Sequence, residues 1–153
     1  MTRRIPRRLA RAPVALYRHG LGWLLGQHLA MIEHRGRISG RPRLVVLEVL
    51  AHDDTGLTVV SGYGRDSQWL RNIVAKARVR IWTGRRQGVP AVAEVLPPDE
   101  SRQLLQAYVD RHPTLAAALG RVLGLDDLRG RSALPADVAA RLPVVEIRYC
   151  GSA

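Results

Sequence analysis

The chain has 153 residues, of which 46% are hydrophobic, which is enough for one domain with a buried core. Lysine and arginine total 24 against 13 acidic residues, and the net charge of +11 favours anionic partners. The single cysteine, Cys150, excludes an internal disulfide, and the five histidines show no pair at metal-ligand spacing. We therefore expect no metal site. Since no nucleophile motif is present, any redox or transfer chemistry is expected to come from a cofactor.

The first 27 residues differ in character from the rest. Six arginines precede the first acidic residue, Glu33: Arg3, Arg4, Arg7, Arg8, Arg11 and Arg18. A helix is predicted from Pro13 to Gly26. Two interpretations stay open: a helix packed on the domain behind a basic tail, or a surface anchor whose arginines attract anionic lipid while Trp23 inserts shallowly. The expected organisation is a basic tail and amphipathic helix over 1–27, followed by a single domain over 28–153.

From His28 the pattern becomes strand-like. Strands are predicted at 28–34, 43–52 and 57–61, and the turn residues between them indicate an antiparallel meander. Glu48 interrupts the apolar second strand, where it either faces water or points into a pocket.

A helix is predicted after the third strand, capped by Asp66 or Ser67 and running to about Ala77. Five apolar residues recur at helical spacing and are expected to face the core: Trp69, Leu70, Ile73, Val74 and Ala77. Asn72 falls outside this stripe. Trp69 also follows a glycine-bearing loop, so it is either a core anchor or the wall of a pocket for a flat ring.

The second half of the chain adds strands and peripheral helices. A second hairpin is predicted with strands at 78–83 and 89–96, where Pro90 indicates an edge position. Helical segments are expected over 97–113, 115–123 and 135–142, and a final strand over 143–150. The result is an α+β domain with about six mostly antiparallel strands. A closed or half-closed barrel suits this count because closure removes the exposed edges.

Two glycine-bearing loops abut these strands, at Gly36–Arg43 and Gly62–Trp69. Glycine lets backbone N–H groups approach a ligand closely, while Ser and Arg add directed hydrogen bonds. Neither loop has the spacing of a dinucleotide or Walker A motif. The sequence therefore predicts a site of modest specificity for an anionic, phosphate-bearing ligand.

The order of these motifs resembles the deazaflavin-dependent nitroreductase and quinone reductase family, which uses coenzyme F-420. The resemblance covers roughly Met31 to Leu96 and rests on Gly-Arg-x-Ser-Gly-x-Pro-Arg, an apolar strand, Val-Val-Ser, a glycine loop and Trp69-Leu70-Arg71-Asn72-Ile73. It implies a split β-barrel like that of FMN-binding proteins. It also implies hydride transfer from reduced F-420 to an electron-poor acceptor, such as a quinone or a nitroaromatic compound, with no catalytic side chain.

The resemblance implies roles for particular residues. Phosphate or tail carboxylates of the cofactor are expected to contact Arg37, Ser39 and Arg43. The ring and phosphate are expected near Ser61, Gly62, Tyr63 and Gly64, and the ring pocket is expected to be shaped by Trp69 and Asn72. The acceptor pocket is expected beside Glu48 and Trp23.

Two departures from the family pattern leave an alternative open. Ile38 and Gly62 stand where related nitroreductases often have lysines, and Glu48 stands where they tend to have an aromatic residue. A non-catalytic split-barrel protein that binds an apolar ligand or the cofactor is the alternative. FMN is less favoured than F-420, because arginine-rich loops suit the longer acidic tail of F-420.

The partners expected from the sequence are a small-molecule acceptor and, if the N-terminus is an anchor, an anionic membrane surface. The expected location is cytoplasmic, with peripheral contact to the inner face of the membrane in that case. Nucleic acid is disfavoured, because aromatic residues make up only 5% of the chain and are not interleaved with arginine. The sequence leaves the acceptor and the oligomeric state open.

Overall fold

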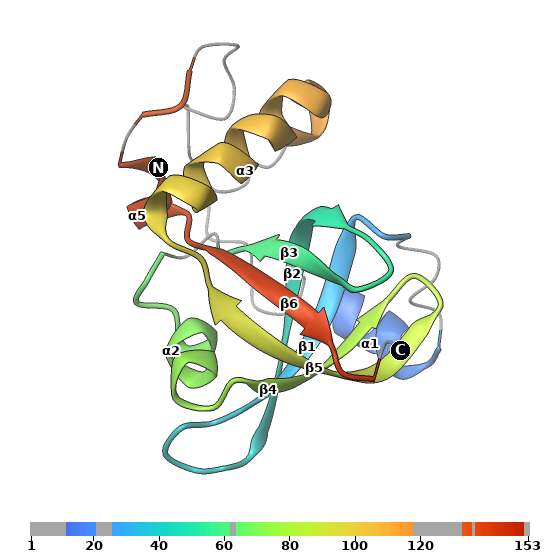
Figure 1. Ribbon diagram of the computed structural model, residues 1–153. Helices are drawn as coiled ribbons and strands as arrows, with labels where there is room; N and C mark the ends of the chain where they lie inside the picture. The colour runs from blue at the N-terminus through green and yellow to red at the C-terminus, as the bar shows by residue number, and fades with distance from the viewer. Residues whose placement is uncertain (1–11, 21–25, 62–63, 118–132, 136, 152–153) are drawn as a thin grey trace.

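The computed structural model describes residues 12–20, 26–61, 64–117, 133–135 and 137–151 (Figure 1). Six strands close into a barrel in the order β1-β2-β3-β6-β5-β4, and every neighbouring pair is antiparallel. The strands are β1 (Leu29–Arg35), β2 (Pro42–His52), β3 (Gly56–Val60), β4 (Arg78–Thr83), β5 (Arg86–Val95) and β6 (Val144–Tyr149). The helices are α1 (Ala12–Arg18), α2 (Gln68–Ala75), α3 (Pro98–Arg111) and α5 (Val138–Arg141). This arrangement confirms the predicted α+β barrel.

The barrel interior is one apolar core. Successive residues of a strand point to opposite faces, so alternate side chains fill the inside. From β2, the inward-facing residues Val45, Leu47 and Val49 join this core. The helix α2 adds Trp69, Leu70 and Ile73. Figure 1 shows α2 at the lower left, beside the loop that joins β1 to β2. One end of the barrel is therefore bounded by this helix and this loop.

A second apolar cluster lies between the outer surface of the barrel and the helices α3 and α5, which Figure 1 shows above the strands. Leu50 and Val60 contribute to it from the barrel, and Leu105 and Tyr108 contribute from α3. The strand β2 thus supplies one face to the inner core and the other to the helical cover. A β2 side chain therefore enters either the inner core or the cluster beneath α3 and α5, depending on the face of the strand from which it projects.

The predicted apolar stripe of α2 is correct for three residues and wrong for two. Trp69, Leu70 and Ile73 are buried, whereas Val74 is 71% exposed and Ala77 is exposed beyond the end of the helix. Asn72 is instead buried at 5% exposure. The helix is only eight residues long, and its inward face meets a polar loop as well as the barrel core.

Other boundaries also required correction. The helix predicted from Pro13 to Gly26 ends at Arg18, where Gly20 adopts a positive φ of 72° that closes the turn. Of the helix predicted over 115–123, the structure describes a helical segment at 113–117. Pro90 does not lie on an edge, because β5 pairs with both β4 and β6 in the closed barrel. Its carbonyl accepts from Cys150 N at 2.8 Å, just beyond the end of β6.

Gly56 provides a test of the strand packing. A Cβ added there would overlap the carbonyl oxygen of Ile147 on β6, which is backbone and has little freedom to move away. We expect Gly56→Ala to lower the free energy of unfolding by about 1–3 kcal/mol or more, through forced separation of β3 and β6. Chemical denaturation measures this change.

The matched control is Asp54→Ala, an exposed position in the same turn, which should change stability by less than about 0.5 kcal/mol. Equal denaturation midpoints for the two variants would show that β3 and β6 are not packed this closely.

Candidate functional site

A groove of about 770 Å³ opens where the β1–β2 loop meets the start of β2 and the first turn of α2. It is lined by His34, Gly36, Arg37, Ile38, Ser39, Arg43, Leu44, Val45, Ser67, Gln68, Trp69 and Asn72. The structure therefore brings together five of the residues predicted to contact a cofactor: Arg37, Ser39, Arg43, Trp69 and Asn72. Their side chains come from the two separate sequence motifs.

The β1–β2 loop is held in a tight turn by its glycines. Gly36 N donates to Arg41 O at 2.9 Å, and Gly40 N donates to Gly36 O at 2.8 Å. Gly40 has a φ of +67°, and a Cβ on Gly36 would lie 2.6 Å from Ser39 Oγ. Gly40 therefore requires glycine, whereas a Cβ on Gly36 would only displace the exposed side chain of Ser39. The turn fixes Arg37 and Ser39 on the lip of the groove.

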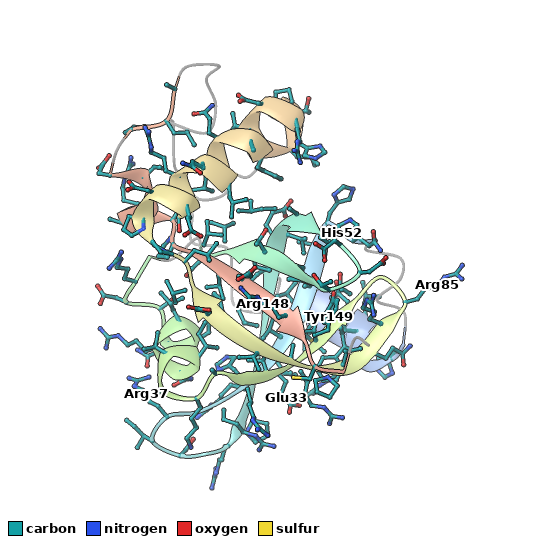
Figure 2. The ribbon with its side chains drawn as sticks, in the orientation of Figure 1. Glu33, Arg37, His52, Arg85, Arg148 and Tyr149 are labelled. Atoms are coloured by element: carbon teal, nitrogen blue, oxygen red, sulfur yellow. The ribbon has the colours of Figure 1, made fainter. Side chains whose placement is uncertain are left out.

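The Asn72 carboxamide fastens this loop to α2. Its Oδ1 accepts hydrogen bonds from the backbone N and from Nη1 of Arg37, both at 3.0 Å. Arg37 Nη1 also donates to Gln68 Oε1 at 2.9 Å. Among the described residues, Nε and Nη2 of Arg37 have no partner. The guanidinium group is thus held by the helix on one side and keeps donors available on the other (Figure 2 labels Arg37).

His34 lies in the same network, at the groove-facing end of β1. It is 4% exposed, and its Nδ1 lies 3.2 Å from Asn72 Nδ2. Burial lowers the pKa of His34 to about 4, and the charge of Arg43 contributes in the same direction. Arg43 is its direct cross-strand partner on β2. His34 is therefore neutral at neutral pH.

Trp69 forms one wall of the groove, and its ring is fixed by a hydrogen bond to a residue that does not line the groove. Trp69 Nε1 donates to Ser61 Oγ at 3.2 Å, so this N–H is already satisfied within the protein. Ser61 is fully buried, and its Oγ also contacts Gly64 O at 3.2 Å and Ser67 Oγ at 3.1 Å. Ser61 thus supports the Trp69 side chain and does not line the groove.

The other predicted site residues lie elsewhere or are not described. Gly64 adopts a φ of +74° and does not line the groove. Gly62, Tyr63 and Trp23 lie outside the described residues.

Glu48, which was expected beside an acceptor, lies on the outer surface of the barrel. Its neighbours Leu47 and Val49 point inward, so Glu48 points outward toward α3. Its Oε1 accepts a hydrogen bond from the Tyr108 hydroxyl at 2.9 Å. Burial raises the pKa of the Glu48 carboxyl, while the Tyr108 hydrogen bond acts in the opposite direction. This contact links the barrel to α3, and Glu48 does not line the groove.

Sequence reasoning assigned no role to His34 or Gln68, although both contribute to the site. His34 could have been identified by strand alternation, since Ala30 and Ile32 of the same strand point into the barrel and His34 continues that face. Gln68 carries no such signal, because its contact is with Arg37, 31 residues earlier.

No group of three or more metal-binding side chains occurs among the residues that the structure describes. None of the helices in that part of the chain has the length and apolar character needed to span a bilayer.

The fold and the groove define a class of protein: antiparallel split barrels with an arginine-bearing groove formed by a glycine loop and a short helix. Residues 9–120 match the F-420H(2)-dependent quinone reductase family, and the chain belongs to this family. It is accordingly an F-420-dependent reductase, and its cofactor is coenzyme F-420. The family predicted from the sequence motifs is confirmed.

Solved structures share the fold at low sequence identity. An F-420-H2 dependent reductase, FDR-A, is 18% identical, with a TM-score of 0.52 over 80% of this chain and 96% of its own. The heme storage protein HutZ from Vibrio cholerae is 11% identical, with a TM-score of 0.52 over 94% and 92% of the two chains.

A protein of unknown function from Agrobacterium tumefaciens is 17% identical, with a TM-score of 0.55 over 99% of this chain and 59% of its own. This chain therefore spans about three-fifths of that protein. No curated protein matches the sequence.

Ser61 and Trp69 allow the support of the groove wall to be tested. Ser61→Ala leaves Trp69 Nε1 buried without its acceptor, so the free energy of unfolding should fall by about 1–3 kcal/mol. In a Trp69→Phe background the same change should cost less, since no indole N–H remains to be satisfied. Chemical denaturation of the four proteins gives the coupling energy.

Ser39→Ala is the control for the loss of a serine hydroxyl, because Ser39 is exposed and should change stability by less than about 0.5 kcal/mol. Additive effects of Ser61→Ala and Trp69→Phe would contradict the coupling of these two side chains.

Proposed function

We propose that the groove between the β1–β2 loop and α2 binds F-420, and that the protein transfers a hydride from the reduced cofactor to an electron-poor acceptor of the quinone type. The observation that carries the proposal is the pre-positioned guanidinium of Arg37. Its Nη1 is fixed by Asn72 and Gln68, so the donors that remain are offered in a defined direction. An oriented arginine is suited to a phosphate or a carboxylate.

The charged end of the cofactor is assigned to the lip of the groove. Arg37, Ser39 and Arg43 line it together, and they combine two guanidinium groups with a hydroxyl. The N-terminal turn of α2 lies beside them and contributes a partial positive charge. Arg71, in contrast, is engaged with Asp66 at 2.7 Å, so it is not needed in this assignment. The donor set fits the phosphate and acidic tail of F-420.

The flat ring is assigned to the apolar wall formed by Leu44, Val45 and Trp69. This wall can pack against a planar ring and keep water from one of its faces. Bound F-420 in its reduced form supplies the hydride. The side chains then have to bind, orient and shield the ring, which agrees with the absence of a nucleophile motif in the sequence.

The proposed class of electron acceptor is supported by the description of the family as quinone reductases. Quinones and nitroaromatic compounds are both planar and electron-poor, and a quinone is the proposed acceptor. Ile38, which is 90% exposed on the lip of the groove, adds apolar surface where such a molecule would enter. The alternative of a non-catalytic carrier predicts cofactor binding without oxidation of the reduced form in the presence of a quinone.

Arg37→Ala tests the assignment of the groove. Loss of a charge-assisted contact should weaken F-420 binding by about 1–3 kcal/mol, or roughly five- to 150-fold in Kd. Fluorescence titration with F-420 measures this, with FMN as the parallel ligand.

The charge-matched control is Arg85→Ala. Arg85 is exposed at the β4–β5 turn, and Figure 2 shows it on the opposite side of the molecule from Arg37. This variant should bind as tightly as the unaltered protein. Equal F-420 affinity of the two variants would show that the cofactor does not bind in the groove. Tight binding of F-420 without oxidation of its reduced form would favour the non-catalytic carrier.

Peripheral membrane contact by residues 1–27 is a second part of the proposal. It is supported by the six arginines that precede Glu33. The division between this segment and a domain over 28–153 also stays a prediction. Within the described part, α1 is attached to the barrel through Tyr17, which is 4% exposed and donates to Leu29 O at 3.0 Å.

Liposome flotation tests the membrane proposal. The full chain should float with vesicles that contain anionic lipid, and substitution of Arg3, Arg4, Arg7 and Arg8 by glutamine should abolish this, because each arginine contributes about 1 kcal/mol to the attraction. The control uses vesicles of zwitterionic lipid only. Flotation that is equal for both proteins would exclude an electrostatic anchor.

A further inference from the structure

His34 lies where a ligand in the groove would meet it, although no role was assigned to it from the sequence. Its side chain belongs to the inward-facing row of β1, after Ala30 and Ile32, and it ends that row at the mouth of the barrel. Its cross-strand partner Arg43 and the loop residue Arg37 line the same groove. The imidazole therefore lies in the part of the groove that carries the two guanidinium groups.

The hydrogen bonds around Asn72 determine which imidazole nitrogen carries the proton. Asn72 Oδ1 accepts two N–H groups from Arg37, so the Nδ2 amide group must be the one that faces His34. An amide nitrogen can only donate, hence His34 Nδ1 is the acceptor. Since the pKa of His34 is lowered to about 4, the ring is neutral and its single proton resides on Nε2.

The Nε2–H group is the unused end of this ring. It has no hydrogen-bond partner among the described residues. In the same part of the chain, no fully buried side-chain nitrogen or oxygen lacks a partner. The Nε2 atom is consequently accessible, and the accessible space next to His34 is the groove. A neutral N–H donor with a fixed direction thus shares the groove with the cationic side chains of Arg37 and Arg43.

We propose that His34 is a further cofactor-contact residue, whose Nε2–H donates a hydrogen bond to an oxygen atom of the bound F-420, and that Asn72 is the positioning residue that holds this tautomer. The inference rests on the proposed function of the groove. The hydrogen-bond acceptor is an oxygen atom of the cofactor's phosphate or of its ring, because a neutral N–H group can donate to either. A purely structural role would require only that His34 fill space beneath Asn72.

Three variants, His34→Phe, His34→Gln and Asn72→Asp, distinguish a cofactor contact by His34 from a purely structural role. His34→Phe keeps a ring but removes the donor, and should weaken F-420 binding about three- to tenfold, as expected for one hydrogen bond. His34→Gln places an amide N–H near the position of Nε2 and should bind within about twofold of the unaltered protein. Thermal denaturation and Trp fluorescence establish that each variant is folded before it is titrated.

Asn72→Asp gives a readout that a space-filling role would not produce. A carboxylate beside Nδ1 draws the proton to Nδ1, so neutral His34 loses its Nε2–H donor and binding weakens at about pH 8.5. The carboxylate also raises the pKa of His34, while Arg37 and Arg43, the other charged residues among the described ones that line the groove, oppose that rise. Below the raised pKa both nitrogens are protonated, so binding should recover toward about pH 5.5.

The affinity of Asn72→Asp is compared with that of the unaltered protein at each pH, which cancels the ionisations of F-420 itself. The recovery should disappear in the double variant His34→Phe/Asn72→Asp. Two results would overturn the role of His34. One is tight binding of F-420 by His34→Phe, and the other is a ratio of the Kd of Asn72→Asp to that of the unaltered protein that does not change with pH. If the unaltered protein fails to bind F-420, or if Arg37→Ala binds equally well, the proposed function of the groove fails instead.

Discussion

The buried carboxamide of Asn72 is the contact on which the geometry of the groove depends. It is 5% exposed, and it bonds to the backbone and side chain of Arg37 on one side and to His34 on the other. A buried amide left without these partners would cost about 1–3 kcal/mol, so the helix, the loop and the end of β1 are held in one arrangement. Asn72 orients the imidazole of His34 and, together with Gln68, the guanidinium of Arg37.

The strand β2 separates two kinds of surface. Its inward-facing residues Arg43 and Val45 reach the groove, whereas Glu48 and Leu50 meet α3 on the outside. At the start of β2 Leu44 also lines the groove, and farther along the strand the alternation of side chains directs Glu48 and Leu50 outward. A carboxylate that looks like a pocket residue in the sequence therefore serves to attach α3 to the barrel, and the groove itself keeps a cationic lip and an apolar wall.

Most elements of the fold could be predicted because their signals are local. The strands of the two hairpins and the final strand were placed within about three residues, since period-two alternation and turn residues mark them. Val74 and Asn72 were assigned to the wrong faces of α2. Helical periodicity identifies an apolar stripe, but it cannot show that a polar loop from β1–β2 packs against the same helix and buries an amide there.

The sequence by itself determined the family, the barrel and the residue types of the groove, because glycines in tight turns, apolar alternation and the ordered loop motifs are properties of neighbouring residues. The tertiary structure decided which of those residues meet. Arg37 and Gln68 are 31 positions apart, and His34 and Asn72 are 38 apart, so their contacts exist only once the barrel has closed. The protonated nitrogen of His34 and the orientation of Arg37 follow from hydrogen bonds across that closure, and no local pattern encodes them.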